Sequence, residues 1–249
     1  MKSCHSYVEI DGSILCTRES EPWKDVKLGR IFKGSECLNP NTAFSYLCRS
    51  QYVAHLGTSR DFGNKLQSAI DSYGELKNRL VFISDGAPWI REWIADHYPL
   101  SCTILDFYHL MEHLYQFADL AFAGAPLEKR EWCDWQKALL LESDVEIVLQ
   151  NIASTVAKDT DKKKLITYCQ NNKKRMRYKQ YRNIGCGIIG SGAIESAHRT
   201  VIQKRMKLSG QRWSREGAEN MLQLRGTAMN CLWHKVIEVC KRPHIALAA

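Results

Sequence analysis

The sequence of 249 residues lacks the features of a membrane or secreted protein. No stretch approaches the roughly 20 apolar residues that a membrane helix needs. The first residues, MKSCHSYVEIDG, contain no apolar run of the signal-peptide type. The ten cysteines include no CxxC pair, so we expect reduced thiols rather than disulfides. We therefore expect a cytoplasmic protein, and neither a membrane nor a small-molecule substrate is indicated.

One cysteine and histidine cluster near the C-terminus has the chemistry of a zinc site. It comprises Cys231, His234, Cys240 and His244. The first pair straddles an apolar helical stretch, however, and His244 follows Pro243 close to the end of the sequence. Zinc binding here is the less favoured interpretation.

Acidic residues are scarce in one segment of the chain. Residues 1–160 hold 16 Lys and Arg against 22 Asp and Glu, whereas residues 161–215 hold 15 against 2, a net charge of +13. The alternative is a solvated lysine-rich surface, but aromatic residues alternate with arginines in KKRMRYKQYR. This segment therefore favours a polyphosphate partner, and DNA is the expected one.

The hydrophobic pattern predicts a mixed α/β sheet followed by helices. The segment YVEIDGSILCTR is typical of two short strands with a bend at Asp-Gly 11–12, and residues 25–33 predict a third strand. Two apolar runs, RLVFISDG and SCTILDFYHL, predict strands buried on both faces. Helices are expected over residues 64–73, ending near Gly74, and over 88–98, 110–123, several segments of 127–183, 193–207 and 215–239.

Three acidic residues are placed where elements begin or end. Asp11 and Asp85 follow predicted strands, and Glu195 begins a helix after a glycine-rich loop. If the first and fourth strands are neighbours, Asp11 and Asp85 lie side by side. Two divalent metals about 4 Å apart, held by such carboxylates, activate a nucleophile and stabilise a leaving oxygen in phosphoryl transfer.

Each acidic residue also has an alternative interpretation. Asp11 and Asp85 can be turn formers in Asp-Gly pairs. Glu195 can interact with the helix dipole and pair with Arg199 one turn later. Taken together, in this element order and beside the basic segment, a metal site is favoured.

Four motifs carry a resemblance to a known family. The blocks VEIDGSILCTRE, VFISDGAPWI, ILDFYHLMEHL and GSGAIESAHRTVIQKRMKLSGQRWS resemble bacterial insertion-sequence DDE transposases of the Kra-type group, which is related to the Mutator-like lineage. The resemblance implies an RNase H-like fold, formed by residues 1–111 and 184–240, with a helical insertion at 112–183. An N-terminal DNA-binding region present in full-length relatives is apparently absent, so the chain can be a truncated copy, part of a split reading frame or a trimmed version.

The resemblance also implies the site. Asp11, Asp85 and Glu195 would bind Mg²⁺ or Mn²⁺ in a two-metal centre, with Asp106 and His109 beside it. The alternative is that Asp106 closes a strand and His109 packs on the next helix. Trp213 can stack on a base, although packing in the core is the more usual role for a lone Trp. DNA contacts are expected from cations of the basic segment, namely Lys173, Lys174, Arg175, Arg177, Lys179, Arg182, Arg199, Lys204, Arg205, Lys207 and Arg212.

The implied activity is cleavage of DNA at insertion-sequence ends by water, followed by attack of the freed 3′-hydroxyl on target DNA. Such an enzyme is expected to act as a homodimer or higher oligomer on DNA, associated with the bacterial nucleoid. One alternative is a truncated, non-catalytic chain that binds DNA or a full-length partner as an inhibitor or relic. Another is a nuclease of the same fold, such as a resolvase, which would cut branched DNA without strand transfer.

Overall fold

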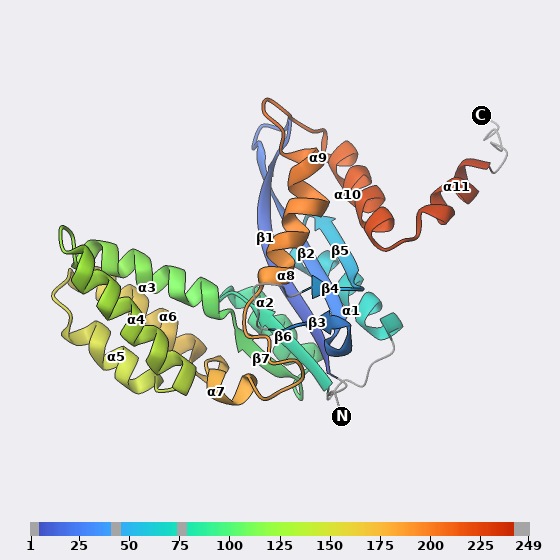
Figure 1. Ribbon diagram of the computed structural model, residues 1–249. Coiled ribbons are helices and arrows are strands. Elements are labelled where there is room, and N and C mark those ends of the chain that lie inside the picture. Colours follow the sequence, from blue (N-terminus) through green and yellow to red (C-terminus); the bar gives the residue numbers. More distant parts are fainter. Residues whose placement is uncertain (1–4, 41–45, 74–78, 242–249) are drawn as a thin grey trace.

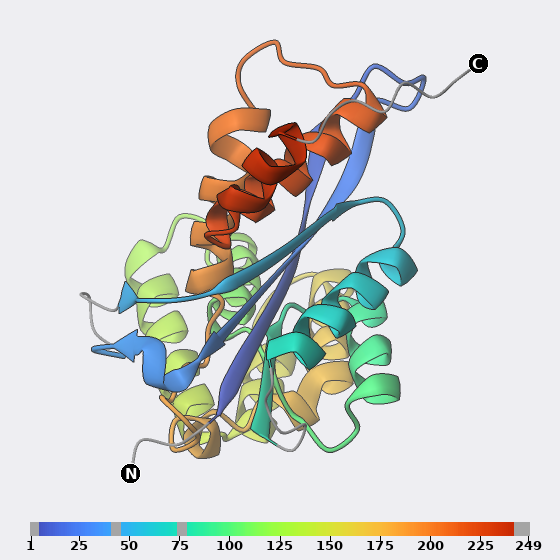
Figure 2. The same ribbon diagram turned by 90° about the vertical axis from the view of Figure 1, so that its right-hand side faces the viewer.

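A five-stranded mixed sheet organises the computed structural model, which describes residues 5–40, 46–73 and 79–241 (Figures 1 and 2). The strand order is β5-β2-β1-β6-β7. The first three strands pair antiparallel, and β1, β6 and β7 pair parallel. The strands are β1 (Ser6–Cys16), β2 (Trp23–Lys33), β5 (Gln51–Leu56), β6 (Leu80–Ser84) and β7 (Cys102–Leu105).

The predicted bend at Asp11 and Gly12 is wrong, because β1 is one continuous strand. Its 11 residues pair with β2 without interruption, from Ser6 opposite Lys33 to Cys16 opposite Trp23. Gly12 is not among the glycines with positive φ, so the Asp-Gly pair makes no turn here. Asp11 consequently lies inside a long strand rather than at its end.

The antiparallel meander contains a strand that the hydrophobic pattern did not predict. The expected third strand, residues 25–33, is β2, and the third strand of the meander is β5, which pairs with β2. A separate two-stranded ladder joins β3 (Cys37–Leu38) to β4 (Tyr46–Leu47) after a single 3-10 turn, η1 (Gly34–Glu36). The predicted strands over 79–86 and 101–110 are confirmed as β6 and β7, each shorter than expected.

Two helices cover one face of the sheet. These are α1 (Ser59–Tyr73) and α2 (Pro88–His97). Val8, Ile10 and Phe82 form one buried cluster with apolar side chains of both helices. Pro88 stands in the first turn of α2, where its missing N–H has no helical partner to lose. Gly74, the expected end of α1, lies outside the described residues.

The opposite face carries a helical lobe, which shares a core with the sheet. Tyr7, Val81 and Ile83 belong to the same buried cluster as Leu114 and Val148 of the lobe. Figure 1 shows this lobe extending to one side of the sheet. Its elements are α3 (Phe107–Ala121), α4 (Pro126–Glu142), α5 (Val145–Ser154), α6 (Asp159–Asn172), η3 (Lys173–Arg175) and α7 (Tyr178–Tyr181).

The C-terminal helices cover the end of the sheet formed by β1, β2 and β5. A nearly continuous helix comprises α8 (Gly192–Ala197), a π-helical stretch (His198–Gln203) and α9 (Lys204–Met206), close to the predicted 193–207. Ile194 and Val201 pack in one cluster with Leu15 and Leu28. Figure 2 shows these helices and α1 on opposite sides of the sheet.

The predicted helix over residues 215–239 is wrong, because the chain forms two helices there. They are α10 (Arg215–Met229) and α11 (Trp233–Lys241). Cys231 lies between them with φ of 59°, a left-handed conformation that ends a helix. α11 has no buried residue and extends away from the sheet (Figure 1). Nowhere in the described ranges is a helix both long and apolar enough to span a membrane.

An asparagine side chain occupies the outer edge of β5. The Asn230 Oδ1 accepts a hydrogen bond of 2.7 Å from the Tyr52 N–H, and its Nδ2 donates to the Tyr52 carbonyl at 2.9 Å. β5 is an edge strand, whose outward peptide groups have no strand partner. The amide of Asn230 therefore pairs with one of these peptide positions.

Candidate functional site

Three aspartates lie in one row across the parallel strands. Ile10 pairs with Ser84, and Ser84 pairs with Leu105, so these residues form one row of the sheet. Asp11, Asp85 and Asp106 each come directly after that row. The carboxyl ends of β6 and β7 thus meet the middle of β1, which continues past them.

Asp11 and Asp85 line the same pocket. It has a volume of about 270 Å³, and its wall includes Asp25, Lys27 and Trp89. The sequence placed Asp11 and Asp85 side by side if their strands were neighbours, and β1 and β6 are neighbours. Three aspartates and Lys27 therefore line one small pocket.

Asp11 also contacts a buried histidine that sequence reasoning missed. The Nε2 of His198 lies 3.1 Å from the Asp11 Oδ2, and the His198 side chain is only 6% exposed. His198 belongs to the π-helical stretch, three residues after Glu195. π-helical bulges occur frequently at functional sites, and this one brings a histidine onto Asp11.

The Asp85 carboxylate has a local structural role as well. Its Oδ1 accepts a hydrogen bond of 3.0 Å from the Ala87 N–H, which fixes the chain entering α2. Gly86 makes room for the helical lobe, since a Cβ there would lie 2.4 Å from the Tyr168 ring. The turn-forming interpretation of Asp85 is thus correct for one oxygen, and it leaves the Oδ2 for other partners.

Glu195 is an exposed residue in the first turn of α8. Desolvation raises the pKa of its carboxyl group, and the negative charges of Asp106, Glu112 and Asp11 raise it further. Like charges nearby disfavour the ionised form of a carboxyl group. Glu195 therefore shares a negative electrostatic environment with Asp11 and Asp106.

A further carboxyl group, that of Glu9, is buried beneath α8. Its side chain is 0% exposed, and its Oε2 accepts a hydrogen bond of 2.6 Å from the Ile194 N–H. Burial raises the pKa of Glu9 to about 8, although Arg30 and the Ile194 N–H act in the opposite direction. The sequence did not predict that Glu9 is buried, because the alternation of apolar and polar residues in β1 places Glu9 on the face expected to be in solvent.

Asp106 and His109 lie at the start of α3. The Asp106 Oδ1 caps this helix by accepting from the Tyr108 N–H at 2.9 Å, and the Oδ2 accepts from the Ser191 hydroxyl. Asp106 therefore joins the loop before α8 to the row of aspartates. His109 points its Nδ1 at Glu112, 3.4 Å away, and its ring contacts that of His113.

No three His, Cys, Asp or Glu side chains within the described ranges are close enough together to hold one ion. Asp11 and Asp85 line one pocket, but the Glu195 carboxylate does not lie close enough for all three residues to bind the same ion. For the zinc alternative, Cys231, His234 and Cys240 are exposed. The fourth residue, His244, lies outside the described residues.

Arg175 is not one of the exposed cations. It is 5% exposed and donates five hydrogen bonds, which end on Ser84, Asp85, Ile104 and Asn172. Its prediction as a DNA contact is therefore wrong for this arrangement, because its guanidinium secures the ends of β6 and β7. Exposed positions are held by Lys173, Lys174, Arg177, Lys179, Arg182, Arg199, Lys204, Arg205, Lys207 and Arg212.

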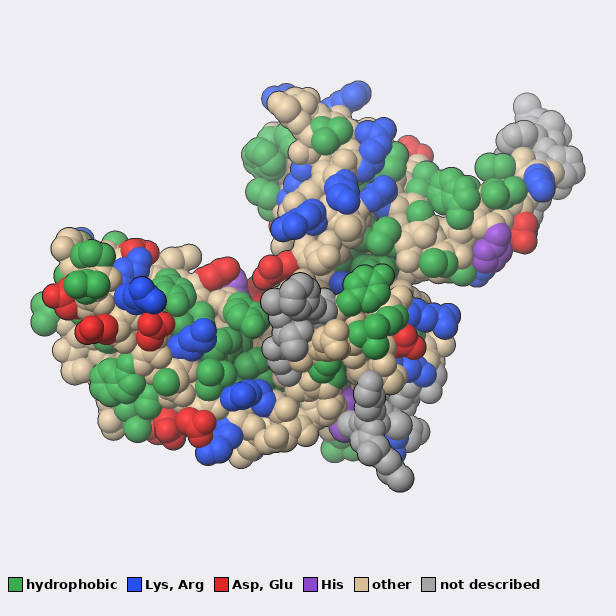
Figure 3. Space-filling view, viewed as in Figure 1, with side chains coloured by type: hydrophobic (Ala, Val, Ile, Leu, Met, Phe, Trp, Pro, Cys, Tyr) green, Lys and Arg blue, Asp and Glu red, His purple; other side chains and the backbone are tan. Residues whose placement is uncertain are grey.

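The exposed cations form two groups. One lies over α8 and α9, where Figure 3 shows Lys and Arg gathered on the surface above the junction with the helical lobe. In this group the Arg205 guanidinium stacks on Trp213, 5.9 Å from the ring centroid. Trp213 packs partly buried against the C-terminal core and donates to the Met206 carbonyl, so the core interpretation is confirmed.

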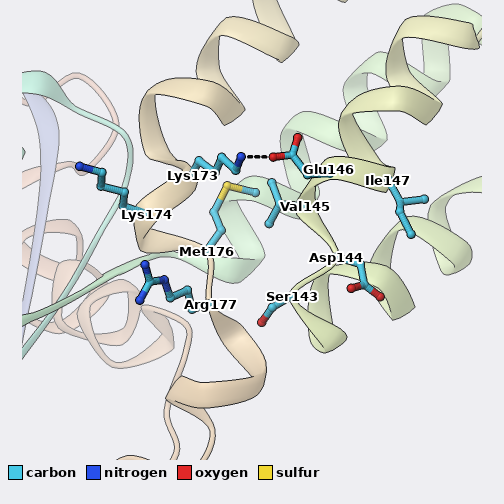
Figure 4. A pocket seen from close by; sticks show the side chains of 9 residues that line it. All are labelled: Ser143, Asp144, Val145, Glu146, Ile147, Lys173, Lys174, Met176 and Arg177. Atoms are coloured by element: carbon cyan, nitrogen blue, oxygen red, sulfur yellow. Dashed lines mark hydrogen bonds and ion pairs between the residues drawn. The ribbon is translucent and has the colours of Figure 1, made fainter.

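The second group lies in the helical lobe, around a pocket of about 450 Å³ (Figure 4). Lys173, Lys174 and Arg177 line it, but so do Asp144 and Glu146, and Lys173 pairs with Glu146. Nearby, the Nζ of Lys179 lies 2.6 Å from a carboxylate oxygen of Glu142. Acidic partners offset part of the positive charge in this group.

These features define a mixed α/β protein that gathers acidic side chains where its parallel strands end. The model of the uncharacterised protein family UPF0236 matches residues 2–242, and the chain belongs to this family. It is similar to the "UPF0236 protein in vanSb 3'region" of Streptococcus gallolyticus, with 25% identity over 237 residues. That match covers 91% of this chain and 50% of the relative, so the chain spans about half the length of this relative.

Proposed function

We propose that this chain is the catalytic core of a metal-dependent DNA transposase with an RNase H-like fold. The observation that carries the proposal is the pocket shared by Asp11 and Asp85, with Glu195 near enough for Asp11 to raise its pKa. The sheet order, three antiparallel strands followed by two parallel ones, supports the fold assignment. Residues 107–181 supply the helices that the proposed fold carries as an insertion, and α3 runs across the expected boundary at residue 112.

The donor atoms suit Mg²⁺ or Mn²⁺, which prefer carboxylate oxygens. Asp11 and Asp85 would hold the cation, and Glu195 would complete the site from the first turn of α8. When bound, the metal would activate the attacking oxygen and stabilise the leaving one. The Oδ2 of Asp11 lies 3.1 Å from the His198 Nε2, and this contact would restrict how that carboxylate turns.

DNA binding is proposed for the cations over α8 and α9 rather than for those of the helical lobe. Arg199 and Lys204 are exposed on the helical segment that continues from α8 to α9, and Lys207 is exposed directly after it. Burial lowers the pKa of Lys207, and the carboxylate of Asp11 acts in the opposite direction, so this cation lies near the acidic pocket.

Substitution of Glu195 tests the proposal. Glu195→Ala should abolish Mn²⁺-dependent cleavage of DNA carrying the element's ends while DNA binding is kept, because the side chain is exposed and buries little surface. Glu112→Ala, which removes an exposed carboxylate that also contributes to the charge near Glu195, is the matched control and should keep cleavage. Undiminished cleavage by the Glu195 variant would refute its assignment.

Two substrates separate the proposed transposase from a nuclease of the same fold. A transposase should join a cleaved 3′ end to a second DNA molecule. A resolvase should cut four-way junctions and release products without joining. DNA binding with neither reaction would favour a non-catalytic role.

A further inference from the structure

The peptide bond between Ala193 and Ile194, just before Glu195, is held from both sides by buried ionisable side chains. The carbonyl of Ala193 accepts from the Arg30 Nη1 at 2.5 Å, and the N–H of Ile194 donates to the Glu9 Oε2 at 2.6 Å. These two atoms belong to one peptide group, whose carbonyl and N–H point in opposite directions. Glu9 and Arg30 therefore hold the two ends of a single dipole.

Contacts within the sheet position both Glu9 and Arg30. Glu9 in β1 stands directly opposite Arg30 in β2. Arg30 is itself held by a hydrogen bond of 2.9 Å from its Nε to the Ser50 hydroxyl and by the ring of Tyr52, 5.2 Å from the guanidinium carbon. Both side chains are buried, at 0% and 7% exposure, so each is restricted by its neighbours.

Glu9 also replaces the usual cap of the helix. Ser191 precedes α8, but its side chain makes no capping bond, because its hydroxyl donates to Asp106 instead. The early N–H groups of a helix need an acceptor from outside its own backbone. The Ile194 N–H also donates to the Ser191 carbonyl at 2.9 Å, and Glu9 supplies a second, closer acceptor from a strand 185 residues away along the chain.

We propose that Glu9 and Arg30 are positioning residues that fix the first turn of α8 and thereby place Glu195 near Asp11. Glu195 comes one residue after the peptide group that Glu9 and Arg30 hold, so a rotation of that peptide group would displace the Glu195 side chain. The role of Glu195 in this inference rests on the proposed function, whereas the clamp itself does not.

Amide hydrogen exchange tests the clamp without any catalysis. Glu9→Leu removes the side-chain acceptor and leaves the Ile194 N–H only the Ser191 carbonyl, so exchange at residues 194–196 should speed up by about tenfold, the loss of one buried hydrogen bond. Glu9→Gln keeps an acceptor oxygen and should restore most of the protection. Val8→Ala, on the other face of β1, is the control for general loss of stability. Equal exchange at 194–196 in the Glu9→Leu and Val8→Ala variants would overturn the proposal.

A second pair of variants keeps the test decisive if Glu9→Leu does not fold. Arg30→Lys retains a donor for the Ala193 carbonyl, whereas Arg30→Met does not, so only Arg30→Met should speed exchange at 194–196. The Mn²⁺ concentration needed for half-maximal cleavage should rise about tenfold in the same variants that lose protection. Lost protection with an unchanged Mn²⁺ requirement would overturn the link to Glu195. If the unaltered protein shows no cleavage at all, the proposed function fails, and exchange still decides whether the clamp exists.

Discussion

Arg175 offers the sharpest test of a distinction between structural and DNA-binding cations. The conservative change Arg175→Lys keeps the positive charge but replaces a planar group with five donors by a point charge with three. The guanidinium now supplies five hydrogen bonds, to the carbonyls of Ser84, Asp85 and Ile104, the Ser84 hydroxyl and the Asn172 amide oxygen.

The magnitude follows from the acceptors that lose a partner. A lysine at this position can satisfy at most three of the five, so at least two of the five acceptors are left without this donor. Each unsatisfied buried group costs about 1–3 kcal/mol. For two such groups we therefore expect Arg175→Lys to lower the free energy of unfolding by about 2–6 kcal/mol.

Urea denaturation measures this loss, and fluorescence anisotropy with labelled duplex DNA measures affinity at several salt concentrations. Because Arg175 is only 5% exposed, affinity and its salt dependence should be unchanged at a temperature where the variant is folded. Arg177→Lys, an exposed neighbour, is the control and should leave stability unaltered. Full stability combined with weakened DNA binding in Arg175→Lys would refute the reasoning.

Two further predictions concern α10 and the basic surface. Burial acts to raise the pKa of Glu219, but hydrogen bonds from Lys65, the Leu56 N–H and His55 outweigh it and bring the pKa to about 2. The stabilisation by the ionised carboxylate is therefore present above pH 4.5 and is lost as pH falls toward 2. In urea denaturation, Glu219→Gln should lower the free energy of unfolding by about 1–2 kcal/mol at pH 7, and the difference should vanish near pH 2. A difference that does not change with pH would contradict this. Replacing Arg199 and Lys204 together by Ala should reduce the slope of log affinity against log salt by about 1.8, and an unchanged slope would remove α8 and α9 from the DNA surface.

Much of the sheet could be predicted from local patterns. β6 and β7 are short apolar runs buried on both faces, and such runs are distinctive. β5 gave no comparable signal, because only Ala54 and Leu56 among its six residues are buried. The break at Cys231 was also unpredictable, since a left-handed conformation at a non-glycine residue depends on local hydrogen bonds.

The acidic residues of the candidate site could be predicted from the sequence, but the buried residues that contact them could not. Asp11 and Asp85 follow apolar segments, which is visible in the sequence. Glu9 and His198 are buried only because α8 packs on the sheet from far along the chain. Arg175 shows the same limit, because a run of cations does not reveal which one faces inward.

The pairing of Asn230 with Tyr52 has a consequence for how copies of this protein could associate. Strand addition at the β5 edge needs free peptide groups, and here the Tyr52 peptide groups are already satisfied. A second chain that extended the sheet on this side would first have to displace the end of α10. Extension of the sheet at the β5 edge would therefore require the α10–β5 contact to open.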